Sequence, residues 1–142
     1  CNKIQGQYTS GICTIAQAAS LEAVKMSPEN SEEIQTMLKA FRNRRDMFFE
    51  LLSEIPGMKL SKPAGAFYMF PEIKSYFGKT DGETTINNSN ELCLYLLDKA
   101  HVACVAGDAF GNDECIRLSY ATSEDKLRDA AARIKEALSK LK

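Results

Sequence analysis

The sequence predicts an α/β fold of the mixed α+β kind, in which helices cover a small mixed sheet. Apolar residues recur at three- and four-residue steps over long stretches, which is typical of amphipathic helices. Short aromatic or β-branched runs lie between prolines and glycines, which is typical of strands. The expected order is helix, long helix, two strands, helix, two strands and helix, in a chain of 142 residues that is long enough to bury a real core.

The first two predicted segments are a loop and a short helix. Residues 1–13 mix Gln, Gly, Thr and Ser without periodicity, so we expect an irregular loop. Thr14 and Gln17 have the spacing of a capping box, and the Ala-rich run at residues 15–24 has high helix propensity and little bulk. We therefore expect a short, closely packed helix after the loop.

A long helix is predicted next. Ser27 is expected to cap it, with Pro28 at its first position, and it should end near Pro56 and Gly57. A rod of about seven turns would be roughly 40 Å long, which is more than one small domain needs. Its apolar stripe consists of Ile34, Met37, Leu38, Phe41, Phe48, Leu52 and Ile55.

Two strands and a polar loop should follow the long helix. Residues 58–60 and 66–70 are short apolar or aromatic runs near Pro63 and Pro71, so we expect strands there. Residues 74–88 are expected to form a polar loop.

A strand–helix–strand crossover and a final helix are predicted for the remainder. Ser89 is expected to cap a helix that leads to a strand at residues 102–105, and Thr122 or Ser123 to cap the last helix. The apolar stripe of the first of these helices is Leu92, Cys93, Leu96, Leu97 and Ala100, and that of the last is Leu127, Ala130, Ala131, Ile134, Leu138 and Leu141.

The strand at residues 115–121 follows a turn flanked by Gly107 and Gly111. Because successive side chains of a strand point to opposite faces, Arg117 and Ser119 should lie on one face of this strand. Ile116, Leu118 and Tyr120 should lie on the other face.

Composition excludes several classes of protein. Hydrophobic residues make up 44% and charged residues 26%, and the net charge is −1 without a basic block, so we expect no nucleic acid partner. No stretch has the 18 or more apolar residues of a membrane span, so we expect no membrane partner. Five cysteines without CxxC spacing indicate reduced thiols in a cytoplasmic protein, with no metal site.

Residue chemistry alone offers one candidate for ligand binding. The sequence contains no paired-carboxylate motif, phosphate loop or nucleophile elbow, which by itself favours a binding or accessory domain. Arg117 lies on a predicted strand beside a glycine-flanked turn, where its planar guanidinium could hold a carboxylate with two hydrogen bonds. A solvated strand arginine is the alternative interpretation.

Three motifs follow one another along the chain, PAGAFYMF at residues 63–70, VACVAGDAFG at 102–111 and CIRLSYA at 115–121. Together they closely resemble class I pyridoxal-phosphate-dependent aminotransferases of the aspartate aminotransferase type. Further matches are QGQYTSG at residues 5–11, FRNRRD at 41–46 and TSED at 122–125. The resemblance therefore covers essentially the whole chain.

The resemblance implies a division of the chain within the fold type I architecture. Residues 1–27 would be the end of the large, cofactor-binding domain, residues 28–55 the long connecting helix, and residues 56–142 the small C-terminal domain. It also implies a transfer of an amino group, with aspartate as donor and 2-oxoglutarate as acceptor.

Pyridoxal 5'-phosphate is the cofactor that the resemblance implies for the intact enzyme. The family's cofactor lysine lies in an S-K-x-x-[GA]-x-x-G-x-R motif that is absent here, and Lys3 has neither the preceding serine nor the following Gly-x-Arg. We therefore expect no catalytic residue, no bound cofactor and no activity in this chain alone.

The resemblance assigns residues to the substrate and cofactor sites. Arg117 matches the arginine that binds the substrate α-carboxylate, and Phe110 matches a turn near the substrate entrance. Thr9 and Ser10 match a loop near the dimer interface and the neighbouring cofactor site, so a homodimer is implied. Local turn hydrogen bonds are the alternative for the two hydroxyls, and packing in the protein interior is the alternative for Phe110.

Two further expectations concern the same segments. Phe67 and Tyr68 should lie in the sheet core, and Ala106 stands where the family usually has proline, which could loosen the turn.

Aromatic or alanine aminotransferases, aminocyclopropane-carboxylate synthases and carbon–sulfur lyases share the carboxylate arginine and remain alternatives. A non-catalytic small-domain binding module is the alternative outside enzymes.

Overall fold

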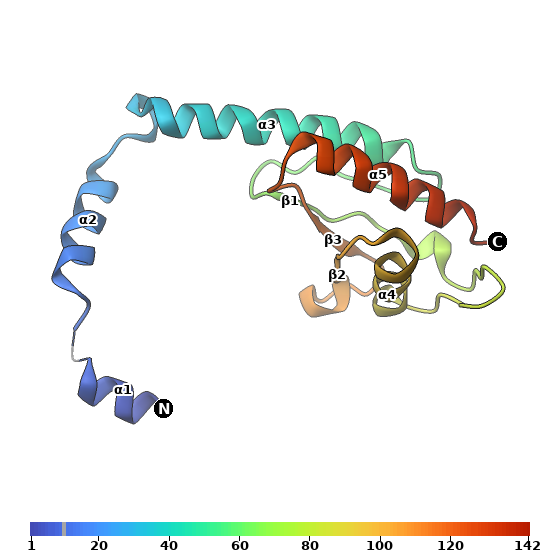
Figure 1. The fold of residues 1–142 in the computed structure, drawn as a ribbon, viewed down its shortest axis with the longest axis horizontal. Coiled ribbons are helices and arrows are strands. Elements are labelled where there is room, and N and C mark those ends of the chain that lie inside the picture. The colour runs from blue at the N-terminus through green and yellow to red at the C-terminus, as the bar shows by residue number, and fades with distance from the viewer. Residues whose placement is uncertain (10) are drawn as a thin grey trace. The chain divides into compact units, whose positions relative to one another are not determined.

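The computed structural model describes residues 1–9 and 11–142, which form two compact units, Cys1–Leu38 and Lys39–Lys142 (Figure 1). The helices are α1 (Asn2–Tyr8), α2 (Thr14–Lys25), α3 (Glu32–Ser53), α4 (Ser89–Ala100) and α5 (Glu124–Ser139). Short 3₁₀ turns are η1 (Pro28–Asn30), η2 (Lys74–Tyr76) and η3 (Gly107–Phe110), and the strands are β1 (Tyr68–Met69), β2 (Val105–Ala106) and β3 (Ile116–Ser119).

The first unit differs from two predictions, the irregular loop at residues 1–13 and the capping box at the start of the next helix. Residues 2–8 form α1, because backbone bonds from Gln5 to Cys1 at 2.9 Å and from Thr9 to Gln5 at 2.8 Å close helical turns despite an internal glycine. The capping box is wrong, since Cys13 occupies the N-cap of α2 without a side-chain bond. The Gln17 amide instead donates to the carbonyl of Ile12 at 2.8 Å.

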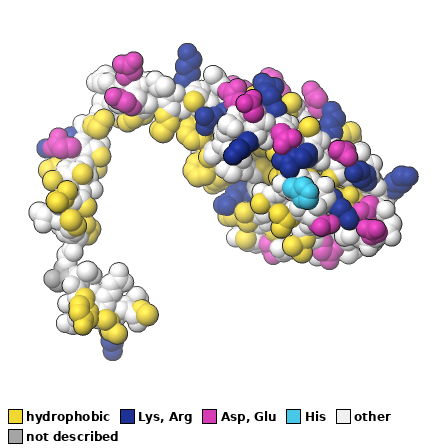
Figure 2. Space-filling model, in the orientation of Figure 1, with side chains coloured by type: hydrophobic (Ala, Val, Ile, Leu, Met, Phe, Trp, Pro, Cys, Tyr) yellow, Lys and Arg dark blue, Asp and Glu magenta, His cyan; other side chains and the backbone are white. Residues whose placement is uncertain are grey.

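Hydrophobic side chains of the first unit are exposed, as Figure 2 shows. None of the described residues of α1 or α2 is buried. Large apolar groups left in solvent normally mark surfaces that other protein covers. The exposed side chains are Ile4, Tyr8, Ile12, Ile15, Leu21, Val24 and Met26.

The long helix α3 begins later than predicted. Pro28 opens η1 rather than the helix, and α3 starts at Glu32 with two acidic residues in its first turn, where the helix dipole favours them. Its 22 residues correspond to about 33 Å rather than 40 Å. Phe48 and Leu52 are buried as predicted, whereas Met37 is 50% exposed.

The sheet of the second unit has the order β1-β3-β2. The predicted fold class is confirmed, but both strand pairings are antiparallel rather than mixed. Residues 58–60 form no strand, and Lys59 makes an isolated bridge to Glu72. Glu72 also forms an isolated bridge to Cys115, the residue that precedes β3.

One core joins the sheet to α3, α4 and α5. On α4 the buried stripe is displaced from the predicted one, because Tyr95 is 3% exposed whereas Leu97 is 50% exposed and Cys93 is half-buried. The core includes Phe48, Leu52, Met69, Leu92, Tyr95, Leu96, Ile116, Leu118, Tyr120, Leu127, Ile134 and Leu138.

Helix α4 starts and ends with specific contacts. Asn88, not Ser89, is its N-cap, and the Asn88 side chain accepts a bond from the Glu91 amide at 2.9 Å. Ser89 is buried and bonds to the carboxylate of Asp113. At the other end His101 adopts a left-handed conformation, with φ of 53°. Ser123 precedes α5 without a side-chain cap.

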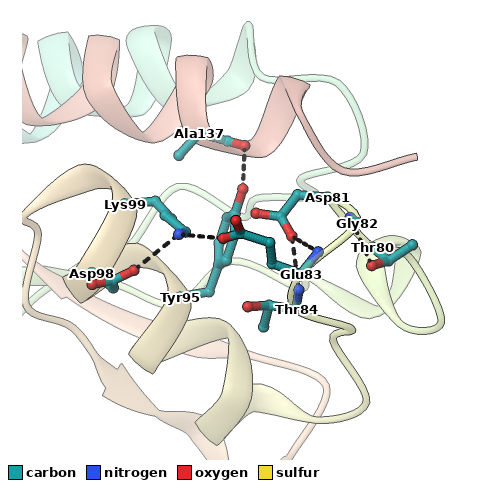
Figure 3. A network of polar contacts seen from close by, with 9 residues as sticks. All are labelled: Thr80, Asp81, Gly82, Glu83, Thr84, Tyr95, Asp98, Lys99 and Ala137. Carbon is teal, nitrogen blue, oxygen red and sulfur yellow. Dashed lines mark hydrogen bonds and ion pairs between the residues drawn. The ribbon is translucent and has the colours of Figure 1, made fainter.

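Polar contacts fix α4 between the loop at residues 80–84 and α5 (Figure 3). The Asp81 carboxylate accepts backbone bonds from Thr84 at 2.8 Å and Glu83 at 3.0 Å, and these bonds lower the pKa of Asp81. Lys99 on α4 pairs with Glu83 at 3.1 Å, and the buried Tyr95 hydroxyl donates to the Ala137 carbonyl of α5 at 3.0 Å. The loop and both helices are thereby tied to one another.

Candidate functional site

The side of the sheet opposite the core carries the candidate site. Val105 is the pairing partner of Arg117, and Tyr68 is the partner of Ser119. Because directly paired residues point to the same face, these four side chains share one face. Ile116 and Leu118 point to the core face, as predicted, and are 0% and 3% exposed.

Aromatic rings surround the Arg117 guanidinium. Its carbon Cζ lies 4.7 Å from the ring centre of Phe110 and 5.3 Å from that of Tyr68, which is within the range of cation–π attraction. Phe110 in turn meets Phe70 edge to face, with ring centres 6.0 Å apart. The rings therefore hold the planar guanidinium at the sheet surface.

The positive charge of Arg117 has no carboxylate partner within 4.0 Å in the part of the chain that the structure describes. Arg117 is only half-buried, so its donors remain accessible. A guanidinium has five N–H donors in a fixed fork that matches a carboxylate or phosphate. The arrangement is therefore suited to binding a planar anion beside aromatic surface.

A tight turn places Phe110 beside Arg117. A Cβ on Gly107 would lie 2.2 Å from the Asn112 carbonyl oxygen and 2.3 Å from that of Cys115, so a side chain has no room there. Gly111 ends η3 with φ of 80°, a conformation that glycine adopts without strain. Both glycines that the sequence singled out thus shape the turn that carries Phe110.

Hydrogen bonds from Tyr120 fix the segment that precedes β1. Ala66 has φ of 61°, which is uncommon for a residue with a side chain. Its carbonyl accepts a bond from the Tyr120 hydroxyl at 3.0 Å, and the Tyr120 amide donates to Phe67 at 2.8 Å. Burial raises the pKa of Tyr120, which keeps its hydroxyl protonated as a donor.

The prediction that Phe67 and Tyr68 lie in the core is wrong. They are 50% and 37% exposed, and Met69, the second residue of β1, is the one that is buried. Tyr68 instead contacts Arg117, a role that the sequence did not reveal. Finding this contact would have required knowing which residues of β1 and β3 pair with each other.

The remaining candidates fall within Cys1–Leu38, outside the unit that carries Arg117. The Thr9 hydroxyl is exposed and donates to the Gln5 carbonyl of α1 at 2.8 Å, which is the local turn bond that the sequence left open. Ser10 lies outside the described residues. Within residues 1–9 and 11–142 no group of three His, Cys, Asp or Glu side chains could hold a metal ion.

No described helix combines the length and the apolar character that crossing a membrane would require.

Comparison with known proteins identifies relatives of the whole chain. The family model for aminotransferase class I and II matches residues 1–134. A bifunctional aspartate aminotransferase and glutamate/aspartate-prephenate aminotransferase from Petunia hybrida is 52% identical over the full chain, which spans 30% of that protein. An aspartate aminotransferase from Pinus pinaster is 48% identical over 97% of the chain, which spans 28% of that protein.

A solved structure is similar to nearly the whole of this chain. The crystal structure of the aspartate aminotransferase from Rhizobium meliloti superposes with a TM-score of 0.86 and 38% identity, over 98% of this chain and 34% of that one. The chain thus spans about a third of the length of the proteins it matches.

Proposed function

The chain belongs to the class I and II aminotransferase family, and on that premise we propose that Arg117 binds the α-carboxylate of the amino-acid and 2-oxo-acid substrates in the intact enzyme. The observation that carries the proposal is the guanidinium without a carboxylate partner among the described residues, placed against Phe110 and Tyr68 on the open face of the sheet.

Arg117 would act by binding and orienting the substrate. Its planar fork can grip both carboxylate oxygens at once. The two rings restrict the rotation of the guanidinium, so less freedom is lost when the substrate binds. A substrate held at one end presents its reacting carbon in a defined orientation, which is the protein's share of catalysis with a cofactor.

Substitution of Arg117 in the full-length enzyme tests this role. Removing one partner of a desolvated charge pair costs about 2–5 kcal/mol, so Arg117→Leu should lower kcat/KM about 30- to 5,000-fold for every amino donor. Arg117→Lys keeps the charge but loses the fork, so it should also be costly. Cofactor content should stay normal in both variants.

Arg44→Lys is the matched control. Arg44 is also half-buried and has its Cζ 5.7 Å from an aromatic ring, that of Phe41, but it lies on α3. It should change kcat/KM less than threefold. A loss for Arg117→Leu that is confined to one donor, or that stays below threefold for two chemically different donors, would leave Arg117 a structural residue.

We propose aspartate as the amino donor and 2-oxoglutarate as the acceptor. The names of the Petunia and pine relatives support aspartate, and the Petunia name favours prephenate as a second amino acceptor. Alanine, aromatic amino acids and the substrates of carbon–sulfur lyases also carry an α-carboxylate, so Arg117 does not separate these reactions. Initial rates of the full-length enzyme with each donor, and with prephenate, decide among them.

Family membership implies pyridoxal phosphate in the intact enzyme, where it supplies an electron sink for amino-group transfer. We expect the described residues of this chain not to bind it, since the cofactor lysine motif is absent and the Thr9 hydroxyl donates to the Gln5 carbonyl of α1. The 142-residue chain alone should therefore be inactive. A visible absorbance band that resists dialysis, at one cofactor per chain, would contradict this expectation.

We also propose that the intact enzyme is a homodimer in the cytoplasm. The exposed apolar side chains of residues 1–27, including Tyr8 at 86% exposure, support packing of this segment within the large domain and at a subunit interface. Residues 28–55 would connect it to the small domain at 56–142. All five cysteines are free thiols, in keeping with a reducing compartment. A fully active monomer in sedimentation at assay concentration would refute the dimer.

A further inference from the structure

Two cysteines from different elements meet beside the sheet. The sulfur of Cys93, on α4, lies 3.3 Å from the sulfur of Cys104, which immediately precedes β2. Both side chains are half-buried, so small solutes can reach them, whereas Cys115 is buried. Figure 1 shows α4, which carries Cys93, next to β2, the strand that Cys104 precedes.

The turn between the two cysteines is fixed by the fold. His101 reverses the chain in a left-handed conformation, and the Val102 amide donates back to the Leu96 carbonyl of α4 at 3.2 Å. The Arg133 guanidinium of α5 donates to the carbonyls of Ala100 at 2.9 Å and His101 at 3.3 Å. The two sulfurs are therefore held near each other by an anchored turn rather than by a mobile loop.

The two thiols are chemically different. The Cys104 thiol donates to the Cys93 sulfur, and this bond lowers the pKa of Cys93 because it stabilises the thiolate. The same bond raises the pKa of Cys104, as does its burial. Since the thiolate is the nucleophile in cysteine oxidation, Cys93 is the thiol that reacts first and Cys104 is the resolving thiol.

We propose that Cys93 and Cys104 form a reversible intramolecular disulfide when the protein meets a peroxide, and that this bond links α4 to the edge of the sheet that carries Arg117. The Cys93 thiolate attacks one peroxide oxygen, the O–O bond breaks, and a sulfenic acid and, with hydrogen peroxide, water are formed. Cys104 then loses its proton and its thiolate attacks that sulfur, the S–O bond breaks, and the departing hydroxide takes up the proton to leave as a second water. Two thiols and one hydrogen peroxide thus give one disulfide and two waters.

The bond would displace the edge strand. A disulfide requires its sulfurs to approach to about 2.05 Å, so the pair must close by roughly 1.2 Å from its present distance of 3.3 Å. Cys104 is followed by Val105, whose backbone pairs with Arg117. Oxidation should therefore raise the KM for the amino donor at least twofold, an effect that rests on the proposed role of Arg117.

Mapping the disulfide tests the pairing without relying on activity. The full-length enzyme is treated with a few equivalents of hydrogen peroxide, its remaining thiols are alkylated, and it is digested. Cleavage after Lys99 and before Asp108 and Asp113 places Cys93, Cys104 and Cys115 on three separate peptides. We expect a Cys93–Cys104 cross-linked peptide in mass spectra, which dithiothreitol removes together with the rise in KM.

Serine variants give the controls. Cys93→Ser should abolish both the cross-link and the rise in KM, whereas Cys13→Ser, which removes a single exposed thiol, should keep both. Accumulation of sulfinic acid at Cys93 with Cys104 still alkylatable would overturn the pairing. A complete cross-link with an unchanged KM would overturn the coupling between the disulfide and the sheet. If a variant does not fold, the digest of the wild-type enzyme still decides whether Cys93 and Cys104 pair. The proposed role of Arg117 has its own test in Arg117→Leu. A failure of that role can therefore be distinguished from a failure of the disulfide proposal.

Discussion

Replacing Phe110 with leucine should weaken substrate binding without unfolding the protein. The ring centre of Phe110 lies 4.7 Å from Cζ of Arg117, and leucine keeps an apolar side chain at the turn while removing the π-face. A cation–π contact at a partly exposed position contributes about 0.5–1 kcal/mol. Because 1.4 kcal/mol is a factor of ten, kcat/KM should fall about 2- to 5-fold. The Tyr68 ring, 5.3 Å away, remains and limits the loss.

Phe67→Leu provides the control for this measurement. Phe67 and Phe110 are both 50% exposed, but the Phe67 ring packs against those of Tyr68 and Phe41, at 5.7 and 6.5 Å, and not against Arg117. Steady-state kinetics of the full-length enzyme with aspartate should show a change below about 1.5-fold for this control. In an Arg117→Leu background, Phe110→Leu should have no further effect, since its partner is already absent. Equal losses for the two phenylalanine variants, or full additivity with Arg117→Leu, would refute the reasoning.

Three substitutions test the framework of the second unit by its free energy of unfolding. Ala106→Pro should stabilise the protein by about 0.4–1 kcal/mol, because Ala106 already has φ of −62°. The Gly107 amide donates to the Cys115 carbonyl, which leaves the Ala106 amide outside the hydrogen-bond ladder between β2 and β3. A loss of stability in denaturant titration would show that the Ala106 amide is needed. Gly107→Ala should cost at least about 1–3 kcal/mol through overpacking against fixed backbone, and an unchanged denaturation midpoint would show that the turn relaxes freely. Tyr95→Phe should cost about 0.5–1.5 kcal/mol, because a buried hydrogen bond is lost while the Ala137 carbonyl keeps its bond from the Lys140 amide at 3.2 Å; faster hydrogen exchange at the junction of α4 and α5 would confirm the site, and an unchanged free energy of unfolding would contradict it.

Helices with one clear apolar stripe could be predicted from the sequence, whereas strand faces and helix ends could not. The terminal helix has buried residues at Leu127, Ala131, Ile134 and Leu138, which are in the predicted stripe, and at Ala137, which is not. In contrast, Pro28 is compatible with the first turn of either a 3₁₀ or an α-helix, so the start of α3 depended on contacts rather than on its own sequence.

The candidate site was predictable only where polarity alternates. On β3 the alternation of Ile116, Arg117 and Leu118 fixed the face of the arginine correctly. In the run of residues 66–70 both alternating sets are apolar or aromatic, so the pattern carries no information on which set faces the core. Tyr68 was therefore misplaced, and its contact with Arg117 could not be inferred.

One face of β3 is buried and the other is partly exposed. Mutations on the two faces therefore differ in how readily they can change substrate selectivity during evolution. Truncating a large apolar side chain on the core face, such as Leu118, costs about 2–5 kcal/mol, which a marginally stable protein rarely tolerates. Substitutions on the partly solvated face usually change stability by less than about 0.5 kcal/mol. A mutational library confined to positions 68, 70, 105 and 119 should thus yield mostly folded members that differ in the surface beside an invariant arginine. New substrate preferences can be sampled there through nearly neutral steps, with the anion anchor retained throughout.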